Sequence, residues 1–270
     1  AGNSGMLAIQ RLNRLQNHLE ILLYDPSSAQ GNIIYNEDNK YYIEITDDLN
    51  FTPDGTQFFI TSQKNGYNHI YLHSIDGKIN KQLTLGQWEV DHIIGYDAVR
   101  KLVYFSAAYS SPLNREICTV DLKGHLKIIA GQPGKNTASF NPNYTYFVKR
   151  WSNANTPYII SVCDARGKEL RILENNAGFS EKAIEYQLQP VEFFSFTTSY
   201  GITIDGWMIK PPHFDAQQRY PVLVYLYGGP GSQTVSNDWE GGRLWYQMMA
   251  LHGIVVVSVD NRGTGFRGEE

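Results

Sequence analysis

Two uninterrupted apolar runs, residues 222–227 and 254–259, give the clearest secondary-structure signal in the chain. Neither run alternates with polar residues, which predicts strands covered on both faces, as in a parallel sheet. Gly228-Gly229-Pro230-Gly231 interrupts the chain after the first run. Because ligands bind beyond the carboxyl ends of strands in open α/β sheets, this glycine loop is the place where chemistry is expected.

The segment between the two runs has a helical pattern over residues 239–251. Its large apolar side chains fall on one stripe, formed by Trp245, Met248, Met249 and Leu251. Strand, glycine loop, helix and strand together form a βαβ unit.

A repeat of shorter strands occupies residues 1–178. Three copies begin at Phe51, Gly95 and Phe140, and the spacing from Phe51 to Tyr96 is 45 residues and from Tyr96 to Phe140 is 44. Each copy predicts a strand, a polar turn, a second strand ending in aspartate, a glycine turn and a third strand. The glycine turns are Asp76-Gly77, 121–124 and 164–167, and a partial copy with a turn at Asp25-Pro26 precedes them.

A period in the forties with several strands per unit is typical of a β-propeller blade. The repeat therefore predicts a partial β-propeller of about three to four blades, with Trp88 and Trp151 packed between blades. A β-sandwich of the same short strands is the alternative, although a repeating order of turns is unusual in sandwiches.

The second part of the chain is expected to begin after a linker helix at residues 179–190, with Ser180 as its N-cap and Pro190 at its end. A hairpin follows, with strands at 192–198 and 203–209 and a turn at Tyr200-Gly201. The predicted organisation is propeller blades over 1–178, the linker helix over 179–190, and the first half of an α/β-hydrolase domain over 191–270. In that count, residues 222–227 form the third strand and 254–259 the fourth.

Composition is that of a globular protein, with 42% hydrophobic and 19% charged residues and a formal charge of −4. This charge gives no indication of nucleic-acid binding. No apolar run reaches the roughly 18 residues that span a bilayer, and residues 1–20 have no signal-peptide core. The abrupt first and last residues suggest that both termini are cuts within a longer protein.

The cysteines, histidines and paired carboxylates of residues 1–178 are expected to have structural roles and no catalytic one. Cys118 and Cys163 lie in strand-like runs and are expected to be small buried hydrophobes. The histidines of the repeat have no metal-ligand spacing, so neither a metal nor a cofactor is predicted; they are His69, His73, His92 and His125. Glu37-Asp38 and Asp47-Asp48 are taken as loop carboxylates without a role.

The strings YPVLVYLYGGPGSQ and VDNRGTGFRG resemble the prolyl oligopeptidase family of serine peptidases, and within it the dipeptidyl peptidase IV group, especially its bacterial members. Further matches in GYNHIYLHSIDG, GQWEVDHIIGYDA and WMIKPPHFD extend the resemblance over almost the whole chain. The resemblance implies an exopeptidase that releases X-Pro or X-Ala dipeptides from peptides with a free N-terminus. It also implies a homodimer and a periplasmic, extracellular or membrane-associated location.

By the same resemblance, Tyr227 donates its hydroxyl to the oxyanion of the transition state. A donor placed where charge develops raises the rate, because the oxyanion exists only in the transition state. The alternative interpretation is structural: without the evidence of the flanking glycines, Tyr227 would be interpreted as an aromatic residue at the end of a strand.

Other parts of the family's site are missing from these 270 residues. No Gly-x-Ser-x-Gly elbow occurs, so the nucleophilic serine is absent, and the aspartate and histidine that follow it in chain order are absent with it. His213 and His252 precede the elbow position and cannot replace that histidine. The family's paired glutamates lie in an earlier blade, and Glu269-Glu270 is at the wrong end to replace them. Residues 260–263 are assigned a structural turn.

The chain alone is therefore expected to be inactive and, with uncovered sheet edges, to be poorly soluble or to self-associate. Two other functions stay open. One is a propeller and hydrolase protein that binds partners without catalysis. The other is a sister enzyme, a prolyl tripeptidyl or acylaminoacyl peptidase.

Overall fold

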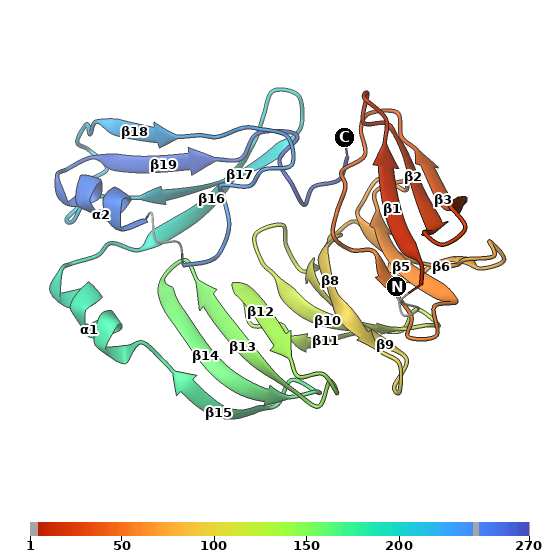
Figure 1. Cartoon of the computed structure of the whole chain (residues 1–270). Helices are drawn as coiled ribbons and strands as arrows, with labels where there is room; N and C mark the ends of the chain where they lie inside the picture. Colours follow the sequence, from red (N-terminus) through yellow and green to blue (C-terminus); the bar gives the residue numbers. More distant parts are fainter. Residues whose placement is uncertain (1–4, 240–242, 270) are drawn as a thin grey trace. The chain divides into compact units, whose positions relative to one another are not determined.

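A computed structural model describes residues 5–239 and 243–269 of the chain. Strands form most of the regular secondary structure of these residues and are arranged in five sheets (Figure 1). Four of these sheets contain strands that are consecutive in the sequence, and the fifth has a crossover. No described helix is long and apolar enough to cross a membrane.

The four consecutive sheets follow the predicted repeat. The first contains β1 (Leu7–Leu12), β2 (His18–Asp25) and β3 (Gln30–Asp38). The second contains β4 (Asn50–Phe51), β5 (Gln57–Ser62), β6 (His69–Ser74) and β7 (Asn80–Gln82). The third contains β8 (Glu89–Asp97), β9 (Leu102–Ala108), β10 (Glu116–Asp121) and β11 (Leu126–Ala130). The fourth contains β12 (Lys135–Phe140), β13 (Tyr146–Asn153), β14 (Thr156–Asp164) and β15 (Glu169–Glu174).

These meander sheets are blades of a partial β-propeller, as the repeat predicts. The predicted glycine turns join the last two strands of three blades, and Gly77, Gly124 and Gly167 all have a positive φ there. Each sequence copy begins near the end of a blade's first strand, so the blade contains one strand more than the three read from a copy. The shortest of these first strands, β4, has two residues, which is too few for a pattern.

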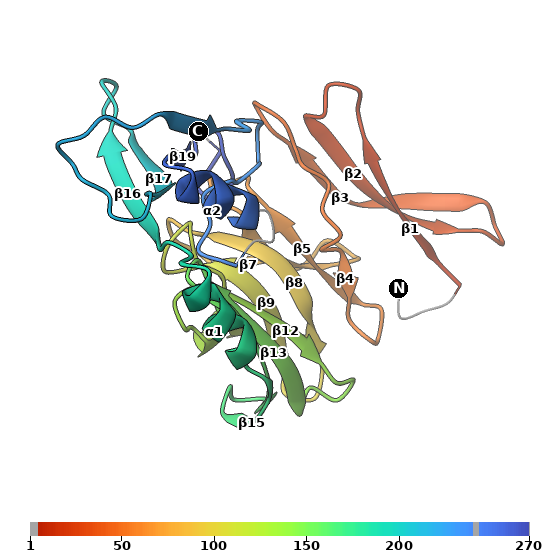
Figure 2. The same cartoon turned by 90° about the vertical axis from the view of Figure 1, so that its left-hand side faces the viewer.

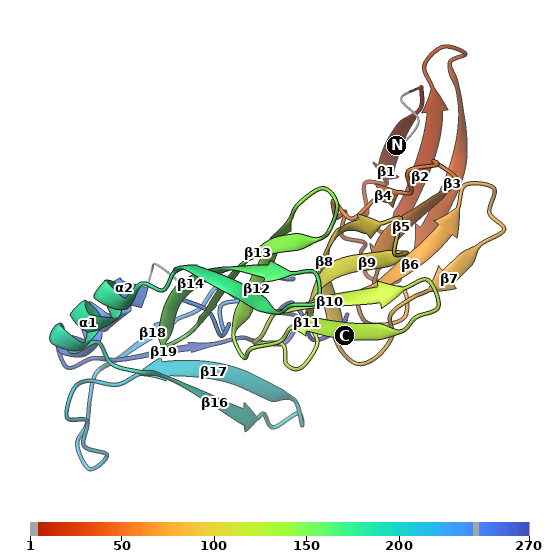
Figure 3. The same ribbon diagram turned by 90° about the horizontal axis from the view of Figure 1, so that it is seen from below.

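Apolar side chains from neighbouring blades meet face to face. Leu19, Ile21 and Tyr35 of the first sheet pack with Phe58 and Ile60 of the second. The second and third sheets share another cluster, and Figure 3 shows β5 and β6 beside β8 and β9. The predicted place of Trp88 between blades is confirmed, because it stacks on Phe105 of β9 and makes a T-shaped contact with His69 of β6. Trp151 is buried and donates its indole N–H to Pro133 O, just before β12, and its packing between blades stays a prediction.

The fifth sheet is mixed and has the strand order β16-β17-β19-β18. It consists of β16 (Val191–Thr197), β17 (Thr203–Ile209), β18 (Val222–Tyr225) and β19 (Val255–Val259). The β16–β17 hairpin is antiparallel, whereas β18 and β19 pair in parallel, as expected of a βαβ unit. Helix α2 (Arg243–Leu251) connects them and contacts β17 and β19 (Figure 2).

The structure corrects the prediction that residues 222–227 are covered on both faces. β18 is an edge strand that ends at Tyr225, and Val222 and Val224 are 58% and 56% exposed. Leu223 packs against the core of the mixed sheet, which contains Trp207 and Val256, and Tyr225 contacts the ring of Tyr246 on helix α2. The apolar run therefore has one covered face here.

Both helices also differ from their predicted bounds. α1 is Ala177–Glu185 and not 179–190, and its N-cap is Asn176 in the left-handed region, so Ser180 is inside the helix. Ser180 cannot cap it because its hydroxyl donates back to Asn176 O. In α2, the buried residues are Arg243, Gln247 and Ala250. Of the predicted stripe, Met249 packs against the core of the mixed sheet, whereas Trp245, Met248 and Leu251 are exposed. Residues 240–242 of that predicted helix lie outside the described part of the chain.

Contacts group the chain into two compact units. The first unit consists of Ala1–Tyr109, Ile117–Ile128 and Gly268–Glu270. The second unit consists of Ser110–Glu116 and Ile129–Arg267. The fourth sheet and the mixed sheet thus belong to one unit. The domain boundaries at 178 and 191 stay a prediction.

Candidate functional site

Tyr227 lies two residues beyond the end of β18, at the start of the glycine loop. Its side chain is 71% exposed. The ring covers Gly229, because a Cβ at that glycine would be 2.6 Å from Cε1 of Tyr227. Gly228 has φ +72°, and a Cβ there would be 2.9 Å from Oδ1 of Asn261. A side chain at Gly228 would strain the backbone turn, whereas one at Gly229 would displace the exposed ring of Tyr227.

The glycine loop is hydrogen-bonded to the turn that follows β19. The N–H of Gly231 donates to Gly263 O at 3.0 Å, and the N–H of Gly265 donates to Ser232 O at 2.9 Å. This turn confirms the structural assignment of residues 260–263, because β19 ends at Val259 and Gly263 has a positive φ. The turn does more than reverse the chain, since its backbone supports the loop that carries Tyr227.

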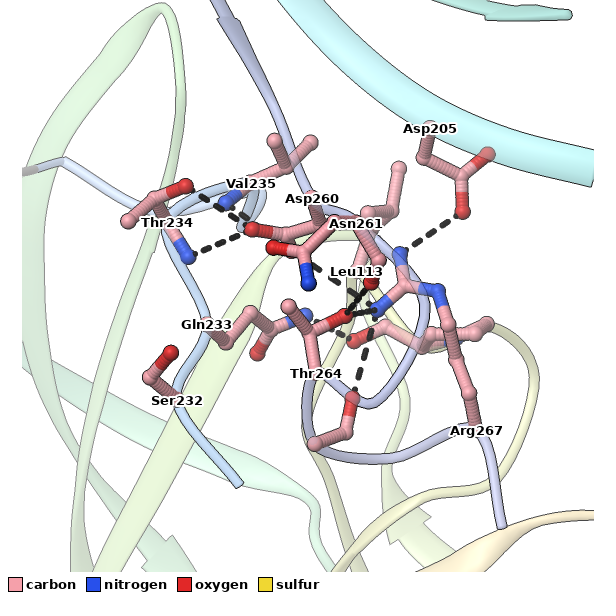
Figure 4. Close-up of polar contacts among 12 residues, drawn as sticks. Leu113, Asp205, Ser232, Gln233, Thr234, Val235, Asp260, Asn261, Thr264 and Arg267 are labelled. Carbon is pink, nitrogen blue, oxygen red and sulfur yellow. Dashed lines mark hydrogen bonds and ion pairs between the residues drawn. The ribbon is translucent and has the colours of Figure 1, made fainter. Parts of the chain in front are cut away.

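Asp260 connects the turn to the loop through its side chain. Its carboxylate is 2% exposed. It accepts the N–H and the hydroxyl of Thr234, both at 2.8 Å, and the N–H of Val235 at 3.2 Å (Figure 4). Sequence reasoning missed this role, because the partners are 25 and 26 residues apart in the chain.

Arg267 supplies the positive charge of this cluster. Its Nη2 donates to Oδ2 of Asp205 on β17 at 2.8 Å, and its Nη1 is 3.6 Å from Oδ2 of Asp260 (Figure 4). The same Nη1 also donates to the hydroxyl of Thr264 and to Gly265 O within the turn. One guanidinium therefore connects the turn, the end of β19 and β17.

Gln233 is held on the other side of the loop by residues 110–116. Its Oε1 accepts from Nη2 of Arg115 at 2.6 Å, and its Nε2 donates to Pro112 O at 2.8 Å. The guanidinium of Arg115 also lies over the ring of Phe266, 3.5 Å from the centroid. Gln233 and Thr234 are thus both fixed, although only the tyrosine at the loop's start was predicted to have a role.

A second polar cluster lies between the first two blades. Glu37 is buried on β3 and accepts hydrogen bonds from the hydroxyls of Tyr35 and Ser62. Nζ of Lys64 is 3.8 Å from the centroid of the Tyr71 ring. Burial lowers the pKa of Lys64 and raises the pKa of Tyr71 to about 12. These side chains are packed in a core, so the prediction of a loop carboxylate is wrong for Glu37.

The other residues named from the sequence are described by their burial and their hydrogen-bond partners. Asp48 is in a loop but is buried, where it accepts from the hydroxyl of Thr61 and the N–H of Ile93, and burial raises its pKa. Both cysteines are buried, as predicted, and burial raises the pKa of Cys163. Glu269 accepts from Asn39, and Glu270 is outside the described residues.

Within residues 5–239 and 243–269, no group of three or more His, Cys, Asp or Glu side chains could hold a metal ion. The glycine loop offers a different kind of chemistry: an exposed phenol on a backbone held at several points. Such a group can donate a hydrogen bond to an anionic oxygen.

Comparison with known proteins points to one family. The profile of the dipeptidyl peptidase IV (DPP IV) N-terminal region matches residues 1–158. A probable dipeptidyl-aminopeptidase B of Emericella nidulans is 34% identical over 98% of this chain and 31% of its own length. A probable dipeptidyl peptidase 4 of Trichophyton verrucosum is 30% identical over 98% of this chain and 36% of its own length. The chain thus spans about a third of the length of these relatives.

Solved structures give the same result for the fold. The crystal structure of Porphyromonas gingivalis dipeptidyl peptidase 4 matches with a TM-score of 0.93 and 37% identity, over 99% of this chain and 38% of that one. A putative dipeptidyl aminopeptidase IV from Bacteroides ovatus matches with a TM-score of 0.84 and 30% identity, over 98% of this chain and 40% of that one.

Proposed function

The chain belongs to the family of the dipeptidyl peptidase IV N-terminal region, and on that premise we propose that it is a portion of a serine exopeptidase. Its substrates are peptides with a free N-terminus, from which X-Pro or X-Ala dipeptides are released through an acyl-enzyme. Four relatives, two of them with solved structures, bear the name of a dipeptidyl peptidase or a dipeptidyl aminopeptidase, which supports this activity.

The mixed sheet is the beginning of an α/β-hydrolase domain in this proposal. The parallel pair β18 and β19 with α2 between them supports it, as does a loop at the carboxyl end of β18. In that fold, an oxyanion donor comes from the loop after the third strand. β18 is the third strand of this sheet in chain order, after β16 and β17.

One observation carries the proposed role of Tyr227. Its phenol is exposed at the start of a loop whose backbone is hydrogen-bonded to the turn after β19. A donor that is already in place costs no reorganisation when the oxyanion forms, and removing one such donor lowers kcat by about 10²–10³-fold. The backbone N–H beside the nucleophile would be the second donor.

The nucleophile itself is not among these 270 residues, which contain no Gly-x-Ser-x-Gly sequence. Catalysis therefore requires a longer protein that includes this chain and a serine elbow. Assembly as a homodimer and a periplasmic, extracellular or membrane-associated location stay predictions.

The experiment is an assay of that longer protein with Ala-Pro-p-nitroanilide and with its N-acetylated form. We expect release of nitroaniline from the free substrate and not from the acetylated one, because the enzyme holds a free amino terminus. Equal cleavage of both substrates would show that no free amino terminus is needed and would contradict a dipeptidyl exopeptidase, and cleavage of neither, with a folded protein, would favour a binding protein.

A further inference from the structure

The side chain of Asp260 makes more hydrogen bonds than are needed to end strand β19. Its carboxylate is buried, and a buried carboxylate is stable only when hydrogen-bond donors replace water. Three of its donors come from Thr234 and Val235, at the far end of the glycine loop. The carboxylate of Asp260 thus receives these three hydrogen bonds from the loop, and the loop's N–H groups depend on Asp260 in return.

The contacts of the turn continue from Asp260 toward Tyr227. Asn261, the next residue, lies so close to Gly228 that a Cβ there would be 2.9 Å from its Oδ1. Gly231 and Ser232 are bonded to the backbone of Gly263 and Gly265. A shift of Asp260 would therefore move the surface against which the first residues of the loop rest.

Arg267 fixes the turn to the sheet. Its guanidinium contacts Asp205 on β17 and Asp260 after β19, so the cluster contains two carboxylates and one cation. The N–H of Asp260 also donates to the backbone carbonyl of Asp205 at 3.1 Å. These contacts hold Asp260 relative to the strands, which is what a support for a catalytic loop requires.

We propose that Asp260 is a positioning residue that sets the location of the Tyr227 phenol through the Gly228–Val235 loop. The proposal rests on the proposed function, in which Tyr227 donates to the oxyanion. Displacement of a catalytic group by about 1 Å can lower the rate by about 10²-fold, so loss of this support should reduce kcat more than it changes KM.

The test is a double-mutant cycle in the longer, active protein. Asp260→Asn keeps the size of the side chain but removes its charge, and Tyr227→Phe removes the phenol. We expect Asp260→Asn to lower kcat by about 10-fold or more with little change in KM. If Asp260 acts through Tyr227, the variant with both changes should be no slower than Tyr227→Phe alone. A purely structural loss would instead multiply the two effects.

The outcomes separate the two proposals. If Tyr227→Phe leaves kcat unchanged, the role of Tyr227 is wrong. If Tyr227→Phe lowers kcat while Asp260→Asn has no effect, or an effect that multiplies with it, then positioning by Asp260 is wrong and the proposed function stands. Asp215→Asn is the matched control, because Asp215 is an exposed aspartate that forms a local turn with Gln217 in the same unit.

Should Asp260→Asn fail to fold, Thr234→Val tests the same contact from the other side. It removes the hydroxyl that donates to Asp260 and keeps the N–H bond. We expect a smaller fall in kcat that again disappears in the Tyr227→Phe background. Independent effects in that background would overturn the proposal.

Discussion

His73 is stacked on Phe58, with ring centroids 5.4 Å apart and planes inclined by 20°. The two residues are a cross-strand pair of β5 and β6. Tyr35 contacts the imidazole with its edge, and the side chain of His73 is 6% exposed. Nε2 of His73 has no hydrogen-bond partner among the described residues. Burial, and secondly the charge of Lys64, lower the pKa of His73 from 6.5 to about 4.

This low pKa predicts an acid-sensitive stability. Between pH 6.5 and about 4 the unfolded chain binds a proton at this histidine and the folded chain does not. Stability is therefore kept above pH 6.5 and lost as the pH falls through that window, by up to roughly 3 kcal/mol. Urea unfolding at pH 7 and pH 4.5 measures the loss. His73→Leu should show a smaller loss between the two pH values than the wild type, whereas His252→Leu, at an exposed position, should match it. Equal losses in all three proteins would contradict the role of His73.

The glycine turns of two blades provide a second prediction. Gly77 and Gly167 both have a positive φ and both donate their N–H to the residue three positions back. They differ in surroundings, because a Cβ at Gly77 meets nothing within 4 Å and a Cβ at Gly167 collides with the carbonyl of Ile129. Gly77→Ala should cost about 1–2 kcal/mol for its backbone conformation alone. Gly167→Ala should cost about 1–3 kcal/mol more.

Thermal unfolding of the two variants measures this difference. Because the turn type is shared, the comparison isolates the steric contribution of the Ile129 carbonyl. Equal shifts in Tm would show that the chain near Ile129 moves away without cost.

Local patterns predicted the blades well, because each turn and each strand depends on neighbours in the sequence. Asp76-Gly77 indicates a hairpin since glycine alone adopts its φ without strain, and the structure has that φ. Side chains whose partners are distant in sequence were not predictable in the same way. Glu37 reads as a loop carboxylate, yet its partner Ser62 is 25 residues away and brings it into a core.

The same limit applies to the candidate site. Tyr227 and its loop could be identified from flanking glycines and from a family resemblance. Asp260 could not, because its hydrogen bonds reach Thr234 across 26 residues. The stripe of α2 was identified from its period, but a period shows that side chains share a face and not which face is covered.

A third prediction concerns the 270-residue chain alone. Without a serine elbow it should release no nitroaniline from Ala-Pro-p-nitroanilide under conditions in which the longer protein does. The measurement needs a serine-directed inhibitor as a control for contaminating peptidases. Turnover that purifies with the chain and is stopped by that inhibitor would show that a nucleophile is present after all.

The last prediction is the effect of Tyr227→Phe on the longer protein. The change removes one hydroxyl and leaves the ring over Gly229, so the loop keeps its packing. If the hydroxyl donates to the oxyanion, kcat should fall about 10²–10³-fold, which corresponds to roughly 3–4 kcal/mol of transition-state stabilisation. KM should change little, because the oxyanion is absent from the ground state. Tyr200→Phe is the control, since Tyr200 lies exposed at the tip of the β16–β17 hairpin. Steady-state kinetics with an X-Pro substrate decide the matter: a raised KM at unchanged kcat would make Tyr227 a substrate contact, and unchanged values would remove it from the mechanism.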